Sequence, residues 1–284
     1  MKQRLFVTLS LAGLAMATFG ATKPKAAIKS LNKTTIQQPT YTEWHDLQVN
    51  AINRFPLHTN FFTYPADDWV SEKDGKIVSK DILHMNKTES KYFLSLDGTW
   101  KFNWVANADQ RPTDFYKEDL DDSKWKTMNV PDNWEMNGFG DPEYVNNGFA
   151  WRGHFDQQPP AVPTKDNHVG SYRRIIDIPA NWDGKQVVAH FGSVTSNIYL
   201  YVNGKFAGYA EDSKVAAEFD ITPYLKKGKN LIAFQTFRWC DGSWDEDQDF
   251  WRLSGVARES YLFARDAKLH LEDIRVTPDL VNNY

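Results

Sequence analysis

An acidic run flanked by tryptophans is the part of this sequence whose residue types could do chemistry. Between Asp241 and Asp249, nine consecutive positions hold five acidic side chains, and Trp239, Trp244 and Trp251 lie in or beside the run. Such a run could hold a metal ion, supply a catalytic carboxylate pair, or bind a sugar. In a sugar site an indole ring faces the C–H surface of the sugar, while carboxylates accept hydrogen bonds from its hydroxyls.

The spacing within the run narrows these alternatives. Asp245, Asp247 and Asp249 resemble the opening of an EF-hand loop, but Phe250 stands where the loop needs Gly and Val256 where it needs a bidentate Glu. The EF-hand hypothesis therefore fails. Paired carboxylates could do acid–base work, yet nothing in the residues indicates which carboxyl would have a raised pKa. A solvated or N–H-capping turn and a hydroxyl- or cation-binding surface both stay open.

A second candidate stretch, residues 131–151, is dense in Asn, Gly and aromatic residues and has no period. A long loop without secondary structure in a compact domain tends to be functional. Asn146 or Asn147 could donate to and accept from a sugar hydroxyl, and an ordinary Asn turn explains them equally well.

The seven His residues show no zinc-ligand spacing, and the sequence has neither a Ser-centred nucleophile elbow nor a phosphate loop.

Composition and the first residues limit the class of protein. Lys and Arg total 33 against 37 Asp and Glu, a net charge of -4, which argues against a nucleic-acid or anionic-lipid partner. Lys2 and Arg4 precede an apolar stretch from Leu5 to Ala17, a pattern typical of a secretory signal peptide and too short for a membrane span. We therefore expect an exported, periplasmic protein. Its single cysteine, Cys240, excludes an intrachain disulfide.

Short runs of β-branched and aromatic residues with a period of two predict strands. The runs are residues 92–104, 171–179, 185–194, 196–212, 229–239 and 259–267. Asn203-Gly204 predicts a tight hairpin, because a type I′ turn needs positive φ at both central positions. Many short strands with little helical period predict an all-β fold, an antiparallel β-sandwich of jelly-roll type.

The composition and residue pattern of the sequence change several times along the chain. We predict a signal peptide at residues 1–21, a flexible leader at 22–40, an irregular strap at 41–90 and the sandwich at 91–267. A fresh strand pattern at 268–284 predicts the first strand of a further domain.

Five stretches of the sequence carry a resemblance to a known family. They are residues 43–54, 95–104, 130–146, 202–222 and 238–258, and the last contains the pattern D-G-S-x-x-E-D-Q-D-x-W-R-x-S-G. Together they resemble the N-terminal sugar-binding domain of glycoside hydrolase family 2, and more narrowly the large bacterial β-galactosidases. The resemblance implies a galactose-binding-domain-like sandwich, and residues 268–284 would then begin a truncated immunoglobulin-like domain.

The resemblance implies a retaining hydrolase of terminal β-D-galactosides. In that family both catalytic Glu residues lie on a (β/α)₈ barrel, which would begin beyond residue 284, so no catalytic residue is expected in this chain. Asn146 matches the family's Asn that contacts the galactosyl unit. Asp249 matches its Asp that binds a sodium or other monovalent ion and a sugar hydroxyl. The implied partners are a galactoside, the catalytic barrel and further copies of the full-length protein in a homo-oligomer.

The family also has a structural magnesium site, which the resemblance maps onto Glu43, Asp46, the carbonyl of Val49, Glu211 and Asp241. Three of these positions depart from the best-known member, because Glu43 replaces an Asp, Asp46 an Asn and Glu211 a Gln. The added negative charge suits a divalent ion, whereas the longer Glu43 side chain changes the geometry.

The leading hypothesis is thus the N-terminal part of an exported β-galactosidase. A free-standing carbohydrate-binding module is the alternative from another class. A family 2 β-glucuronidase or β-mannosidase would keep the enzyme class with another sugar. Asn146 and the run 247–251 favour galactose.

Overall fold

The computed structural model describes residues 38–81, 83–146, 148, 151, 155–156, 158–246 and 248–280. The predicted signal peptide and most of the predicted leader lie outside these residues, as do Asn147 and Asp247. Strands dominate the described residues, and none of their helices is long and apolar enough to cross a membrane. The helices are α1 (Ala66–Trp69) and the 3₁₀ turns η1 (Glu43–His45), η2 (Lys87–Glu89), η3 (Ala108–Gln110), η4 (Glu135–Asn137), η5 (Ala180–Trp182), η6 (Thr222–Tyr224) and η7 (Asp241–Trp244).

The larger sheet has seven strands in the order β1-β13-β12-β15-β9-β5-β6, each antiparallel to its neighbours. Their bounds are β1 Ala51–Ile52, β13 Lys205–Ala210, β12 Ile198–Val202, β15 Gly228–Phe237, β9 Val169–Ile178, β5 Gly98–Val105 and β6 Lys126–Val130. The long central strands β9 and β15 pair along their whole length, so they form one continuous antiparallel ladder.

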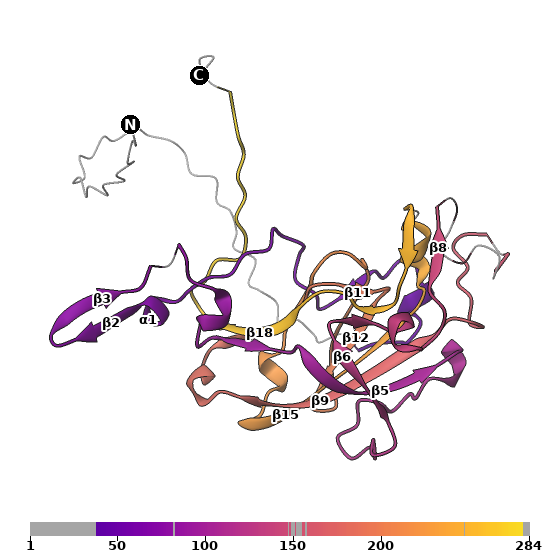
Figure 1. Cartoon of the computed structure of the whole chain (residues 1–284), viewed down its shortest axis with the longest axis horizontal. Coiled ribbons are helices and arrows are strands. Elements are labelled where there is room, and N and C mark those ends of the chain that lie inside the picture. Colours follow the sequence, from indigo (N-terminus) through magenta and orange to yellow (C-terminus); the bar gives the residue numbers. More distant parts are fainter. Residues whose placement is uncertain are drawn as a thin grey trace, which may run out of the picture. The chain divides into compact units, whose positions relative to one another are not determined.

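A second sheet has four strands in the order β14-β10-β18-β4, also antiparallel. Figure 1 shows β18 in a layer above β9 and β15. The remaining strands form small ribbons, β11-β17-β7, β16-β8 and β2-β3. The bounds of these strands are β14 Ala217–Asp220, β10 Gln186–Phe191, β18 Ser260–Arg265, β4 Phe93–Ser95, β11 Val194–Thr195, β17 Gly255–Val256, β7 Asp132–Asn133, β16 Phe250–Arg252, β8 Glu143–Val145, β2 Val70–Lys73 and β3 Lys76–Ser79.

These sheets confirm the predicted all-β antiparallel sandwich. Each of the six predicted strand runs contains at least one strand, and the run 196–212 folds as the β12–β13 hairpin. Asn203 and Gly204 have φ values of 49° and 77°, as the type I′ turn requires.

Aromatic side chains fill the space between the two sheets. Tyr172 of β9 stacks on Phe234 of β15 with ring centroids 4.3 Å apart, and Phe191 of β10 meets Phe234 from the opposite sheet at 5.3 Å. All three side chains are buried. This layer supplies most of the apolar burial that stabilises the fold.

The outer face of the larger sheet is covered as well, which explains why β12 is buried at every position instead of alternating. Trp44 of the predicted strap stacks on Phe237 of β15 at 5.0 Å, and Phe115 packs edge-on against Tyr201 of β12 at 5.3 Å. The strap also contains regular structure that its irregular sequence did not predict, since β1 joins the edge of the larger sheet through β13.

The prediction of a structureless loop at residues 131–151 was wrong in part. The described part of this stretch contains β7, η4 and β8. Both strands are too short to show a period, and their partners β17 and β16 lie far away in the sequence. Such pairing depends on tertiary contacts that local propensity does not encode.

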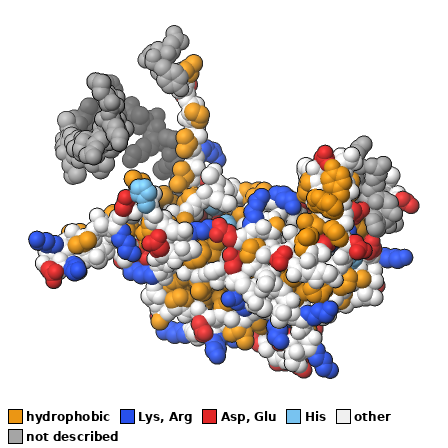
Figure 2. Space-filling model, viewed as in Figure 1, with side chains coloured by type: hydrophobic (Ala, Val, Ile, Leu, Met, Phe, Trp, Pro, Cys, Tyr) orange, Lys and Arg blue, Asp and Glu red, His pale blue; other side chains and the backbone are white. Residues whose placement is uncertain are grey.

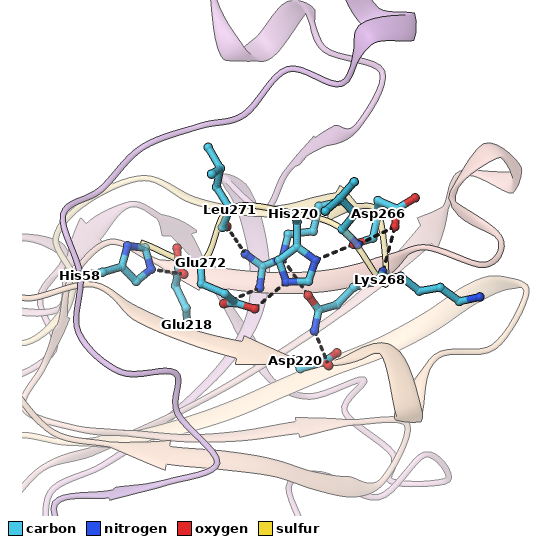
Figure 3. A network of polar contacts seen from close by, with 11 residues as sticks. His58, Glu218, Asp220, Asp266, Lys268, His270, Leu271 and Glu272 are labelled. Carbon is cyan, nitrogen blue, oxygen red and sulfur yellow. Dashed lines mark hydrogen bonds and ion pairs between the residues drawn. The ribbon is translucent and has the colours of Figure 1, made fainter. Parts of the chain in front are cut away.

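A polar network fastens the segment that follows β18 to the smaller sheet (Figure 3). Arg265 donates to the carbonyl of Leu271 at 3.1 Å and pairs with Glu272 at 3.2 Å, while His270 contacts the same carboxylate at 2.5 Å. Residues 268–280 form no strand, so the first strand predicted for a further domain is not formed here. A strand needs a partner, and this segment pairs with none among the described residues.

Candidate functional site

The β8–β16 ribbon brings the two predicted sugar-contacting residues to one place. Its register pairs Tyr144 with Trp251 and Val145 with Phe250. Continued by one position, the same register sets Asn146 opposite Asp249. Successive side chains alternate between the two faces of a strand, so one face of the ribbon carries Tyr144 and Trp251 together with this Asn–Asp pair.

This face of the ribbon is open to solvent and largely apolar. Tyr144 is 52% exposed and Trp251 54%, and their ring centroids lie 5.6 Å apart. Figure 2 shows apolar side chains gathered over this part of the molecule. Flat aromatic rings beside an amide and a carboxylate suit a sugar, because the rings cover its C–H face and the polar groups bind its hydroxyls.

Tyr144 also orients the carboxylate. Its hydroxyl donates a hydrogen bond to Oδ1 of Asp249, and this bond raises the pKa of the Tyr144 phenol. One oxygen of Asp249 is thereby held by the protein, and the other can accept from a ligand. The sequence analysis missed Tyr144, although its position two residues before Asn146 puts both on one strand face.

Charged groups behind the ribbon hold it in position. Arg238, which follows β15, pairs with Glu143 of β8 at 3.0 Å. Arg252 of β16 donates to the carbonyl of Gln248 at 2.8 Å, and so fixes the backbone just before Asp249. The ribbon is therefore attached to the end of the β9–β15 ladder.

A buried acidic cluster lies where η7 follows β15. One ligand atom each from Glu211, Cys240 and Asp241 lies within 4.8 Å of the others, and these are the residues that could hold a metal ion within the described part of the chain. Burial, with the nearby charge of Asp241, raises the pKa of Glu211 to about 8. Burial likewise raises the pKa of Asp241, whose Oδ1 is buried with no hydrogen-bond partner.

These residues fit a hard cation better than a soft one. Burial raises the pKa of the Cys240 thiol, which favours the neutral S–H form. The carboxylate oxygens of Glu211 and Asp241 are the ligand type that Mg²⁺ and Ca²⁺ prefer. A bound cation would also relieve the repulsion between two buried carboxylates.

The strap brings the remaining predicted ligands to this neighbourhood. Glu43 is buried and accepts hydrogen bonds from the Tyr199 hydroxyl at 3.1 Å and the Thr40 amide at 2.6 Å. The amide of Val49 donates to the Asp46 carbonyl at 2.9 Å. The turn η1, which directly precedes Asp46, contacts η7, which begins at Asp241.

Two tyrosines connect Glu43 with the acidic cluster. Tyr199 donates to Glu43, Tyr209 donates to Glu211 at 2.5 Å, and the two rings lie 4.5 Å apart. Glu43 therefore already has protein partners, whereas Asp241 has an unused oxygen. Sequence reasoning missed both tyrosines because they lie on the buried outer face of the larger sheet, where their residue type indicates only packing.

Asp249 and Asp245 lie outside the acidic cluster and have other partners. Asp249 is not among the clustered metal-type ligands of the described residues, and it accepts a hydrogen bond from Tyr144. Asp245 is exposed and ends η7 through its amide, which donates to the Gly242 carbonyl. The acidic run is thus divided between a buried cluster, a solvated turn and the aromatic ribbon.

A family model described as "Glycosyl hydrolases family 2, sugar binding domain" matches residues 93–266. The chain belongs to glycosyl hydrolase family 2. The region of this family 2 chain that matches includes Asn146, Glu211, Asp241 and Asp249, while the strap with Glu43 precedes it.

Curated relatives of this family 2 chain are named β-galactosidases. The one from Priestia megaterium is 37% identical over 245 residues, which cover 86% of this chain and 22% of the relative. The one from Streptococcus thermophilus is 41% identical over 200 residues, which cover 70% of this chain and 19% of the relative. The chain thus spans about a fifth of the length of the curated relatives it matches.

Solved structures similar to this chain include a β-glucuronidase of Bacteroides uniformis. It is 22% identical with a TM-score of 0.46, and the match covers 61% of this chain and 18% of that one. A likeness at this level carries no conclusion about the sugar.

Proposed function

We propose that this chain is the N-terminal, sugar-binding part of an exported β-galactosidase that hydrolyses terminal β-D-galactosides with retention. The observation that carries the proposal is the face of the β8–β16 ribbon, where the register sets Asn146 opposite Asp249 beside two exposed aromatic rings. The similarity to curated β-galactosidases over most of the chain supports galactose as the sugar.

In this proposal the chain binds and orients the galactosyl unit. The Asn146 amide donates to and accepts from sugar hydroxyls, and the free oxygen of Asp249 accepts from another hydroxyl. Trp251 and Tyr144 shield one face of the sugar from water, which strengthens these hydrogen bonds. The two catalytic Glu residues would come from the barrel of the full-length enzyme.

Two cations belong to the proposal. A sodium or other monovalent ion would bind at Asp249 and offer a further coordination position to a sugar hydroxyl. A magnesium ion would bind at Glu211 and Asp241, with Glu43, Asp46 and the carbonyl of Val49 on the strap side. Its chemical contribution is charge neutralisation, which would fasten the strap to η7.

A chimeric enzyme tests the proposal. Residues 41–280 of this chain replace the homologous segment of the Priestia megaterium β-galactosidase, and hydrolysis of nitrophenyl β-galactoside, β-glucuronide and β-mannoside is measured. We expect hydrolysis of the galactoside, and a loss of about 100-fold or more in kcat/KM with Asp249→Asn, the range for removal of a charged transition-state contact. The isolated chain should hydrolyse none of the three.

Two results would contradict the proposal. Preference of the chimera for the glucuronide or mannoside would assign another sugar. Unchanged kcat/KM in both Asn146→Ala and Asp249→Asn chimeras would remove the ribbon from the site. If the isolated chain instead bound galactosides tightly, with a dissociation constant in the micromolar range, the carbohydrate-binding module would be the better function.

A further inference from the structure

A separate pocket opens beside the turn of the β12–β13 hairpin. Its volume is about 410 Å³, within the range of about 300–1,000 Å³ in which small-molecule sites lie. Its aromatic lining consists of Tyr41, Tyr116, Tyr201, Phe206 and Tyr224, and Lys205 is the charged residue among those that line it.

This pocket lies apart from the ribbon, and none of its lining residues belongs to the cluster of Glu211, Cys240 and Asp241. Strand β13 begins at Lys205, in the pocket, and ends at Ala210, directly before Glu211. Six residues of strand span about 20 Å. The loop that follows β13 lies against the acidic run, since the Ser213 amide donates to Glu246 at 3.1 Å. The pocket and the Asn146–Asp249 face are thus at opposite ends of this hairpin.

Three tyrosine hydroxyls converge in the pocket. The rings of Tyr116 and Tyr201 are stacked, with centroids 4.3 Å apart and planes 8° from parallel. The hydroxyl of Tyr41 shares a hydrogen bond with that of Tyr201, and Tyr116 lies beside them. Tyr201 is buried, whereas Tyr41 and Tyr116 are only partly buried, so parts of these two side chains face the pocket.

The hydrogen-bonding capacity of this group is not used up. Each phenol has one donor and two acceptor lone pairs. The one hydrogen bond between the Tyr41 and Tyr201 hydroxyls uses one of the three donors, which leaves two donors and several lone pairs for a ligand. Mixed donors and acceptors beside aromatic rings match a sugar, whose hydroxyls both donate and accept and whose C–H face is apolar.

The charge of the lining excludes some ligands. Among the described residues no Asp, Glu or His lines the pocket, so its lining offers no anionic side chain to a cationic ligand. Lys205 is exposed and leaves the aromatic floor uncharged. A neutral hexose unit fits this lining better than a cation or a purely apolar molecule.

We propose that the pocket of Tyr41, Tyr116 and Tyr201 is a second carbohydrate-binding site, which takes a neutral hexose unit of a glycan chain. Binding at this pocket does not depend on the proposed function, because the pocket residues share nothing with the Asn146–Asp249 face; only the effect of that binding rests on the proposed function. Its effect would be to hold an extended glycan on the protein while another part of that glycan occupies the first site, which raises the effective concentration there.

Saturation-transfer NMR and titration with methyl β-D-galactoside and lactose test the proposal on the full chain. Tyr116→Ala removes the partly exposed ring, and we expect about tenfold weaker binding at this site. Tyr116→Phe keeps the ring and its stack on Tyr201 but removes the hydroxyl, so binding should weaken less. Asn146→Ala removes the proposed sugar contact of the ribbon, so binding that remains in this variant reports the pocket. Tyr64→Phe removes a hydroxyl bonded to the Met85 carbonyl elsewhere and is the matched control that should leave binding unchanged.

The possible results separate the two sites. Binding that survives Asn146→Ala and is lost in Tyr116→Ala, with an unchanged circular dichroism spectrum, supports the second site. Binding that is lost in Asn146→Ala but survives in both Tyr116 variants overturns it and leaves the ribbon as the binding site. Absence of any transfer to the sugars in the wild-type chain overturns it too. If the Tyr116→Ala chain does not fold, the Tyr116→Phe chain decides the question. An unchanged affinity of that chain for the sugars would overturn the second site.

Discussion

The hydroxyl of Tyr144 donates a hydrogen bond to the carboxylate of Asp249, across a ladder that joins two segments far apart in the sequence. The same ladder sets Asn146 opposite Asp249. The two residues that the sequence predicted separately as sugar contacts therefore come to the same end of one ribbon, and Asp249 is oriented by a tyrosine that was not predicted.

Replacing Tyr144 tests this dependence. Tyr144→Phe keeps the ring on the ribbon face but frees the Asp249 carboxylate, so galactoside affinity should fall about three- to tenfold, as expected for loss of one orienting hydrogen bond. The measurement is titration of the chain with methyl β-D-galactoside. Tyr64→Phe removes a hydroxyl bonded to the Met85 carbonyl elsewhere and should have no effect on affinity. Equal losses in both variants would show that the effect is not specific to Asp249.

Magnesium should stabilise the chain through the acidic cluster. A ligand present at 100 times its dissociation constant adds about 2.7 kcal/mol to the free energy of unfolding, and thermal unfolding with Mg²⁺ or with a chelator measures this. Asp241→Asn should abolish the response and, in chelator, should itself raise Tm, because it removes a buried carboxylate that has no cation to pair with. The exposed Asp109→Asn is the control and should respond to Mg²⁺ as the wild type does. If neither Mg²⁺ nor Ca²⁺ changes the Tm of the wild-type chain, the cluster is not a cation site.

The strap should be held by a pH-dependent ion pair. His58 lies 3.0 Å from Glu218, whose other oxygen contacts His190 at 2.7 Å, and His190 stacks on Tyr261 (Figure 3 shows the His58 contact). Burial lowers the pKa of His58, but its hydrogen bonds to Thr59 and Glu218 and the charges of Glu218 and Asp273 outweigh burial and raise it.

The sign of the effect follows from that raised pKa. The stabilisation is complete below the unfolded pKa of about 6.5 and is lost as the pH rises through the higher folded value. His58→Gln should therefore cost about 1 kcal/mol at pH 5.5 and less at pH 8.5. Urea unfolding at both pH values measures it. Burial would also raise the pKa of Glu218, but the two histidines lower it, so Glu218 stays charged at pH 5.5. A larger cost at pH 8.5 would contradict the ion pair.

The packing around Gly170 should leave no room for a larger side chain, because Trp134, between β7 and η4, lies against it. A Cβ at Gly170 would lie 2.4 Å from the Trp134 ring and 2.8 Å from Phe102, both buried. Gly170→Ala should lower the free energy of unfolding by about 1–3 kcal/mol, the usual cost of overpacking. Gly75→Ala is the comparison, since its φ is +71° and no atom lies within 4 Å of the added Cβ, so only backbone strain of about 1 kcal/mol is expected. Denaturant unfolding of both variants decides between the two causes, and a smaller loss in Gly170→Ala would exclude overpacking.

The sequence predicted the elements whose stabilising pattern is local. The Asn203-Gly204 turn and the long strands β9 and β15 carry their own period and turn chemistry, and each formed where it was expected. Short elements such as β1, β8 and β16 were missed, because two or three residues show no period and are stabilised only by the strand they pair with.

By itself, the sequence determined the all-β antiparallel class, the family resemblance and the residue types of the candidate site, because strand period, turn residues and motif letters are properties of neighbouring positions. Only the tertiary structure decided that Val145 pairs with Phe250, which brings Asn146 and Asp249 to the same end of one ribbon, that Glu211 lies beside Asp241, and that Tyr41, Tyr116 and Tyr201 share a pocket. Each of these relationships joins residues from separate strands or loops. Their distances are fixed by sheet register and by burial, which no local stretch of sequence contains.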